Sequence, residues 1–216
     1  MLGLPKTTEF NKRIPKEKFY GNLSLTPAQK KMFREQIRII YWKNKIATTT
    51  VNLAAGEKVT ELQVFEILLN QPQLDEAVLT QIDRTLPYHI LFVLTHNDKQ
   101  QACIAYKEAT ASGGYAFKVL KYYKTDWLPA EQMQLEFTGR SLDAVYENYV
   151  RQIAGNEIEA NAAGDLQTDV ERSERKRLLQ KQIDDLQAKI RKEKQFNRQV
   201  ELNAEVKKLQ KMLQSI

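Results

Sequence analysis

Cysteine and histidine are scarce in this 216-residue chain, which holds one cysteine and two histidines. The single cysteine, Cys103, excludes a disulfide within the chain, and its apolar surroundings predict a buried thiol rather than a nucleophile. His89 and His96 leave little material for a histidine-based catalytic or metal site. The sequence also lacks a Gly-rich phosphate loop, Cys/His metal spacing and a nucleophile elbow, so we expect no cofactor.

Long apolar runs are missing as well. The first residues lack the apolar core of a signal peptide, and no run approaches the length of a membrane span. Hydrophobic residues make up 42% of the chain, which is enough for a real core. We therefore expect a soluble protein of the reducing cytoplasm, with one ordinary domain, an appendage and no membrane partner.

Basic charge is concentrated at the two ends of the chain. The net charge is +8 over residues 1–45, −7 over residues 46–167 and +5 over residues 168–216. This pattern allows the ends to contact nucleic acid, and equally allows them to lie on the acidic middle or on an acidic partner. The candidate contact residues in the N-terminal arm are Lys12, Arg13, Lys16 and Lys18.

The hydrophobic pattern predicts an α+β domain over residues 1–154, entered by a basic arm whose aromatic residues lie on the domain. The expected helices cover residues 26–41, 74–86 and 141–153. The expected strands cover residues 61–69, 90–95, 102–107, 115–123 and 133–137, and the threonines at 48–50 favour an extended chain. The fold class that results is a mainly antiparallel sheet of four or five strands with flanking helices.

A linker over residues 155–167 leads to a helical tail over residues 168–216. Two apolar stripes follow a coiled-coil spacing, namely Leu179, Ile183, Leu186 and Ile190, then Leu202, Val206, Leu209 and Leu213. The phase slips by two residues between them, across a polar segment at 193–198, which favours an antiparallel helical hairpin. A bent or continuous helix that dimerises or docks on a partner is the alternative. In either case Leu202, Val206, Leu209 and Leu213 are the expected docking residues.

A metal-dependent nuclease is the most specific enzymatic alternative. Such sites place carboxylates on neighbouring strands to hold Mg²⁺, with a lysine that polarises the phosphate. Glu66, Asp83, Asp98 and Lys107 are the candidates for this arrangement. However, Ala105 stands two residues before Lys107, where an acid is needed, and Glu108 points to the other face of a strand.

Several short motifs together resemble a known bacterial family. They are Leu4-Pro5, residues 11–16 (NKRIPK), 40–45 (IYWKNK), 63–67 (QVFEI), 86–92 (LPYHILF) and 194–203 (KQFNRQVELN). The chain is similar to the family of unknown function catalogued as domain of unknown function forty-three ninety-one. Its members are commonly encoded beside helicase and DNA methyltransferase genes of restriction or phage-defence type.

The resemblance implies a non-catalytic accessory subunit of such a defence complex. A helicase or methyltransferase, or a second copy of the chain, is then the expected protein partner, with nucleic acid as a further partner. The family supplies no catalytic residues to carry over. The alternatives are a nuclease or other DNA-processing enzyme, and a free-standing nucleic-acid-binding protein.

Overall fold

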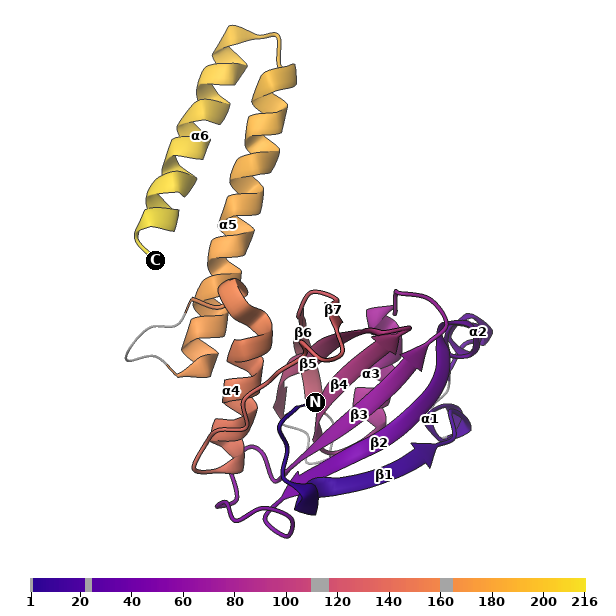
Figure 1. Cartoon of the computed structure of the whole chain (residues 1–216). Helices are drawn as coiled ribbons and strands as arrows, with labels where there is room; N and C mark the ends of the chain where they lie inside the picture. The colour runs from indigo at the N-terminus through magenta and orange to yellow at the C-terminus, as the bar shows by residue number, and fades with distance from the viewer. Residues whose placement is uncertain (1, 22–24, 110–116, 160–164) are drawn as a thin grey trace. The chain divides into compact units, whose positions relative to one another are not determined.

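The structure, a computed structural model, describes residues 2–21, 25–109, 117–159 and 165–216 (Figure 1). It divides into two compact units, Met1–Gly155 and Asn156–Ile216. The elements follow in the order η1 (Lys6–Thr8), β1 (Glu9–Ile14), α1 (Glu17–Gly21), α2 (Pro27–Gln36), β2 (Ile37–Ala47), β3 (Glu61–Leu69), α3 (Glu76–Thr85), β4 (His89–His96), β5 (Lys99–Ala109), β6 (Phe117–Lys124), β7 (Leu128–Pro129), α4 (Leu142–Ala154), η2 (Gly155–Glu157), α5 (Leu166–Lys192) and α6 (Phe196–Gln214).

The sheet is larger than the sequence predicts, with seven strands in place of four or five. Its main path runs β1-β2-β3-β4-β5-β6, and the short β7 pairs with β5. Two of the additional strands, β1 and β2, lie in the N-terminal segment. The basic arm is therefore an edge strand of the sheet, since β1 pairs antiparallel with β2.

The sheet is also mixed rather than purely antiparallel, because β3 and β4 are parallel, with Phe65 opposite Phe92. The chain leaves β3, forms α3 and returns as β4, and such a helical crossover is the usual connection between parallel strands. Both strands are almost fully buried, which is typical of strands covered on both faces.

The first helix that the sequence predicts in the large unit begins at the expected residue and ends earlier. The Thr26 hydroxyl accepts a hydrogen bond from the Gln29 amide at 3.2 Å, and the Gln29 side chain accepts one from the Thr26 amide at 2.9 Å. This capping box fixes the start of α2. The helix ends at Gln36, and the isoleucine-rich segment that follows forms β2, in line with the strand preference of β-branched residues.

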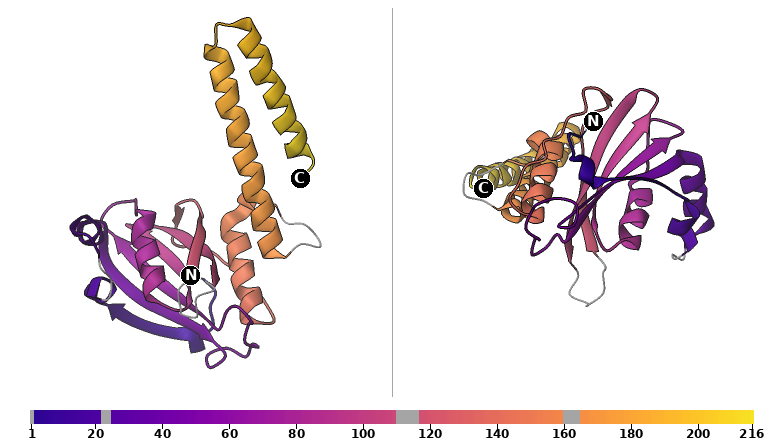
Figure 2. Two further views of the ribbon diagram at one scale, coloured as in Figure 1. Left: turned by 180° about the vertical axis from the view of Figure 1, so that it is seen from behind. Right: turned by 60° about the horizontal axis from the view of Figure 1, so that its bottom comes forward.

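In the large unit, helices lie on both faces of the sheet (Figure 2), and apolar side chains are buried on each face. One face packs against α1, α2 and α3, whose core residues include Phe19, Phe33 and Leu79. The other face carries Leu62, Leu91 and Ile104, and α4 contacts β3, β5 and β6. The large unit is thus a sheet between two helical layers, built around one continuous strand array.

Two predicted extended segments are not strands. The threonines at 48–50 form a turn, in which the Thr50 hydroxyl accepts from the Ala47 amide at 3.0 Å. The predicted strand at 133–137 pairs with no other segment in the described part of the chain. Met133 and Leu135 are nevertheless buried, so their alternation reflects burial without strand pairing.

The small unit contains the predicted antiparallel helical hairpin. Its two helices, α5 and α6, contact each other and run side by side in both Figure 1 and Figure 2. Ile183, Leu202 and Val206 are buried, whereas Leu209 and Leu213 are half-buried. Among the described residues, no helix combines the length and hydropathy that crossing a bilayer demands.

The turn between α5 and α6 needs neither glycine nor proline. Glu193 and Gln195 have extended backbone angles, with φ of −74° and −86°, so no left-handed residue is required. The Glu193 carboxylate accepts hydrogen bonds from the amides of Lys194 and Gln195 at 2.8 and 2.9 Å. The Gln199 side chain donates to the Glu193 carbonyl at 2.7 Å. Side-chain hydrogen bonds therefore fix the reversal.

Candidate functional site

A buried polar cluster lies between α3 and the strands β5 and β6. The Lys107 ammonium donates to the Asp83 carboxylate at 2.8 Å and to the Tyr88 carbonyl at 2.7 Å. The Tyr122 hydroxyl donates to the second oxygen of Asp83. The side chains of Lys107 and Asp83 are each only 1% exposed. The cluster is therefore a sealed ion pair in which the charges satisfy each other.

Burial alters the titration of the groups in and beside this cluster. It lowers the pKa of Lys107, although the contact with Asp83 opposes that shift. It raises the pKa of the Tyr122 hydroxyl, with the Asp83 charge adding to the effect, so this phenol remains a hydrogen-bond donor. Burial and, after it, the Lys107 charge lower the pKa of His89 to about 3. His89 is thus neutral at physiological pH.

The structure does not assemble the nuclease site that the sequence allows. Asp83 and Lys107 face the helical layer formed by α3, whereas Glu66 alternates with the core residues Phe65 and Ile67 and faces the opposite side of the sheet. Asp98 is exposed in the turn between β4 and β5. No group of three His, Cys, Asp or Glu side chains is placed to hold a metal ion in the described ranges.

Glu66 has local partners of its own. Lys43 lies 3.7 Å from one carboxylate oxygen, and the Thr95 hydroxyl donates to the other at 3.1 Å. These contacts join β2, β3 and β4 on the face of the sheet away from α3. Glu66 therefore stabilises strand neighbours rather than sharing a site with Asp83.

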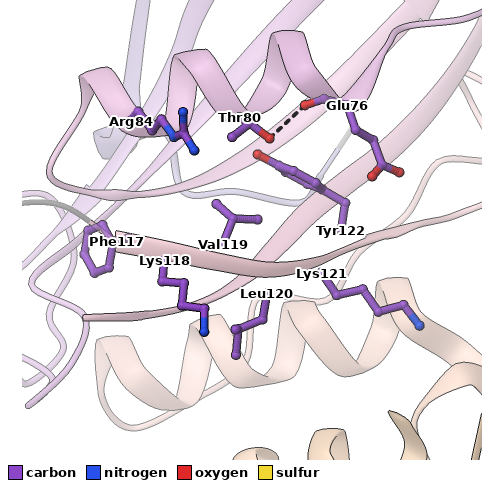
Figure 3. A pocket seen from close by; sticks show the side chains of 9 residues that line it. All are labelled: Glu76, Thr80, Arg84, Phe117, Lys118, Val119, Leu120, Lys121 and Tyr122. Atoms are coloured by element: carbon purple, nitrogen blue, oxygen red, sulfur yellow. Dashed lines mark hydrogen bonds between the residues drawn. The ribbon is translucent and has the colours of Figure 1, made fainter. Parts of the chain in front are cut away.

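A pocket of about 290 Å³ lies along β6 and α3 (Figure 3). In the view, Thr80 and Arg84 reach it from the helix, and Val119 and Tyr122 from the strand, while Lys118 and Leu120 point to the other side of β6. The Thr80 hydroxyl donates to the Glu76 carbonyl at 2.9 Å. The lining also includes the charged side chains of Glu76 and Arg84, so the pocket is mixed polar and apolar in character.

The two histidines have different surroundings. His89 is buried against the rings of Phe117 and Tyr146, with centroids 4.9 and 4.4 Å away. His96 is half-buried, and its Nδ1 lies 3.4 Å from the Leu69 carbonyl oxygen. Cys103 is fully buried, and burial raises the pKa of its thiol, which confirms the predicted buried cysteine.

The four cations predicted for nucleic-acid or acidic-partner contact do not converge. Lys12 and Arg13 are exposed neighbours on the edge strand β1, so their side chains leave opposite faces of the sheet. Lys16 donates to the Ile37 carbonyl at 2.6 Å and so ties the arm to β2. Lys18 is exposed on α1. Of the four, Lys12, Arg13 and Lys18 are therefore exposed, and Lys12 and Arg13 lie on opposite faces of the sheet.

The predicted docking residues of the tail fall into two groups. Leu202 and Val206 are buried, at 7% and 6% exposure, and hold the hairpin together. Leu209 and Leu213 are half-buried and continue the same stripe. The half-buried part of the hairpin therefore begins at Leu209 and includes three residues of α5, namely Leu179, Leu186 and Ile190.

The stripe analysis of the tail misses two apolar residues at the hairpin turn. Phe196 is 75% exposed and Val200 is 53% exposed, although both belong to α6. Neither falls on the repeat that starts at Leu202. This is the one feature of the sequence that distinguishes these two exposed residues from the buried residues of the stripe. Nothing in the local sequence predicts the pairing of Asp83 with Lys107, because the two residues meet only through the sheet.

The fold and its polar cluster define a mixed α/β domain with a helical hairpin, in which the buried charged groups serve the structure. The chain belongs to the family described as Domain of unknown function (DUF4391), whose model matches residues 2–213. This match confirms the resemblance drawn from the sequence motifs. No curated protein and no solved structure matches the chain.

Proposed function

We propose that this protein is a non-catalytic accessory subunit of a bacterial restriction-like or phage-defence complex. Its helical hairpin docks on a helicase or methyltransferase partner. The observation that carries this proposal is the incomplete burial of the hairpin stripe, in which Leu209 and Leu213 are left half-covered. Short helices gain most of their stability from tertiary packing, so a two-helix unit with an open apolar edge is suited to a third surface.

The polar cluster supports an accessory role over a nuclease. A catalytic lysine must reach a phosphate, whereas Lys107 is 1% exposed and bound to Asp83 and a carbonyl. Cleavage of DNA that depends on Mg²⁺ or Mn²⁺ and survives purification to homogeneity would replace the accessory role with the nuclease alternative.

The test is co-purification from the native host with the full-length tagged chain. We expect a helicase or methyltransferase to accompany the wild-type chain and to be absent with the double variant Leu209→Glu/Leu213→Glu. The milder variant Leu213→Ala should reduce the recovered partner while keeping the hairpin helical by circular dichroism. Leu178→Ala truncates an exposed leucine of α5 outside the stripe and serves as the matched control.

Recovery of neither enzyme with the wild-type chain, at native expression levels, would remove the basis of the proposal. Equal recovery with the wild type and the double variant would show that docking uses another surface.

A further inference from the structure

The turn of the hairpin presents the most exposed large apolar side chain of the described residues, Phe196 at 75%. Val200, one helical turn further along α6, is 53% exposed on the same side of the helix. Single exposed apolar side chains are common on protein surfaces, so Phe196 and Val200 indicate a contact site only together with the other features of this turn. We define the hairpin tip as residues 189–200, the end of the hairpin remote from the C terminus (Figure 1).

The hairpin tip is held in a fixed shape. Glu193 accepts two backbone hydrogen bonds across the turn, and the Gln199 side chain donates to the Glu193 carbonyl. Phe196 is the first residue of α6, so its position follows from the position of this turn. Binding through Phe196 therefore costs little conformational entropy, which favours affinity.

The hairpin tip also carries uncompensated positive charge. Lys189, Arg191, Lys192 and Lys194 are exposed, and none of them has an ion pair within the described ranges. The acids nearby are engaged elsewhere. Glu193 binds backbone amides, and Glu201 pairs with Arg198 at 2.5 Å.

The opposite end of α5 differs in this respect. Arg172 pairs with Asp169 at 3.1 Å, and Arg177 pairs with Glu174 at 2.6 Å. Arg175 and Lys181 of the same helix have no ion pair in the described ranges, so α5 neutralises part of its positive charge away from the tip and none of it at the tip. The last-turn cations of α5 also offset the helix dipole, but this effect needs neither Lys194 nor an exposed Phe196.

We propose that the hairpin tip binds an unpaired nucleic-acid strand, with Phe196 stacked on a base and the free cations against the flanking phosphates. Exposed aromatic rings among basic side chains suit single strands, whose bases offer a flat face and whose backbone is anionic. The net charge of the whole chain, +6, adds long-range attraction for the same polyanion.

Two other ligands fit this surface less well. A duplex does not offer a free base face, and two adjacent helices, each about 10 Å wide, exceed the roughly 12 Å width of a major groove. An anionic membrane is bound in proportion to the apolar area inserted, and Phe196 and Val200 supply little of it.

This inference goes beyond the docking role and does not depend on it. The docking surface consists of the half-buried stripe, which shares Ile190 with the tip, whereas Phe196 and the exposed cations lie outside that stripe. Loss of strand binding in a Phe196 variant that still recovers the protein partner separates the two proposals, as does the reverse result.

The experiment measures binding of the full-length chain to a fluorescein-labelled oligothymidylate of about 20 nucleotides by anisotropy, a length sufficient for one such site. We expect Phe196→Ala to weaken binding about tenfold, in the range found for loss of one base stack. Phe196→Leu keeps an apolar side chain without an aromatic face and should bind as weakly as Phe196→Ala. Phe196→Trp should bind at least as tightly as the wild type.

The charge is tested with Lys192→Glu/Lys194→Glu, which should weaken binding about tenfold or more. This variant should also lower the slope of log affinity against log salt by about 1.4, because each phosphate that a lysine no longer neutralises reduces the slope by about 0.7. Leu178→Ala, exposed on α5 away from the tip, is the control and should leave the affinity unchanged.

Three outcomes would overturn the proposal. The first is equal binding by the wild type and Phe196→Ala. The second is wild-type affinity in Phe196→Leu together with weakened binding in Phe196→Ala, which indicates apolar insertion rather than stacking. The third is binding to phosphatidylserine-containing vesicles without binding to the oligonucleotide, which assigns the tip to a membrane surface.

Discussion

The two compact units of this protein differ in where their side chains find partners. In Met1–Gly155, apolar residues are buried on both faces of the sheet, and the Asp83–Lys107 ion pair is closed off from solvent. In the hairpin, by contrast, the described residues from Glu171 to Ile216 bury only Ile183, Leu202 and Val206. The large unit thus buries most of its apolar residues, whereas the hairpin leaves much of its apolar stripe half-exposed.

The largest effect is expected from Lys107→Ala, which leaves the Asp83 carboxylate buried without its cation. Breaking a buried pair in this way destabilises proteins by about 3 to 5 kcal/mol. Urea denaturation of the full chain measures the loss. The control is Lys43→Ala, because its pair with Glu66 spans 3.7 Å and is partly exposed, so about 1 kcal/mol or less is expected. A loss below about 1 kcal/mol for Lys107→Ala would contradict the sealed ion pair.

Ile183→Ala should lower the free energy of unfolding of the hairpin by about 2 to 3 kcal/mol. This is the lower end of the range for a buried isoleucine, because side chains at a partly exposed helix interface can shift to fill the cavity. Hydrogen exchange by mass spectrometry should show faster exchange in α5 and α6 only. Leu178→Ala on the same helix should change exchange little, since Leu178 is exposed. Faster exchange in the strands would instead indicate that the two units unfold together.

Acidification should destabilise the large unit through His89. Its pKa is about 3 in the folded chain, compared with an ordinary value of 6.5. The stabilisation is complete above pH 6.5 and diminishes as the pH falls toward 3, because only the unfolded state then binds the proton. The expected decrease in the free energy of unfolding between pH 8 and pH 5 is about 2 kcal/mol.

Denaturation curves at several pH values measure this decrease. His89→Gln should flatten the dependence between pH 8 and pH 5. An unchanged slope in His89→Gln would assign the pH dependence to other groups.

The smallest effect on stability is expected from Phe196→Ala, at about 0.5 kcal/mol or less, because an exposed side chain packs against little and alanine favours helix. Thermal denaturation followed by circular dichroism checks this. A large destabilisation would mean that Phe196 supports the hairpin itself, and the contrast between the tip and the buried seam would then disappear.

Periodicity within one element is what the sequence reveals best. The tail stripes and their phase slip predict the hairpin, and the alternating or apolar runs predict β3 through β6. The strand β2 is hidden because Ile37 and Ile40 stand three apart and fit a helical stripe as well as a strand. The parallel pairing of β3 and β4 involves two separate segments, so periodicity within either one does not reveal it. Their order around α3 and their continuous apolar runs are nevertheless typical of parallel strands.

In the candidate sites, too, the sequence shows which residues are present but not which of them meet in the fold. The basic residues of the arm are visible in the sequence, but their separation depends on the β1 strand, which places Lys12 and Arg13 on opposite faces. Asp83 and Lys107 are 24 positions apart and meet at 2.8 Å only because the fold brings α3 and β5 together. Exposure of Phe196 likewise depends on the hairpin turn. Residues 193–195 contain no glycine or proline that would mark the position of this turn in the sequence.

The buried thiol of Cys103 can report how often the large unit unfolds. Alkylating reagents react with the thiolate, and both the full burial of Cys103 and its raised pKa suppress that form in the folded chain. With no second cysteine in the sequence, every modification event records an opening of the central sheet. The rate at which Cys103 is alkylated thus measures the unfolding of the large unit. Opening of the hairpin alone leaves this rate unchanged.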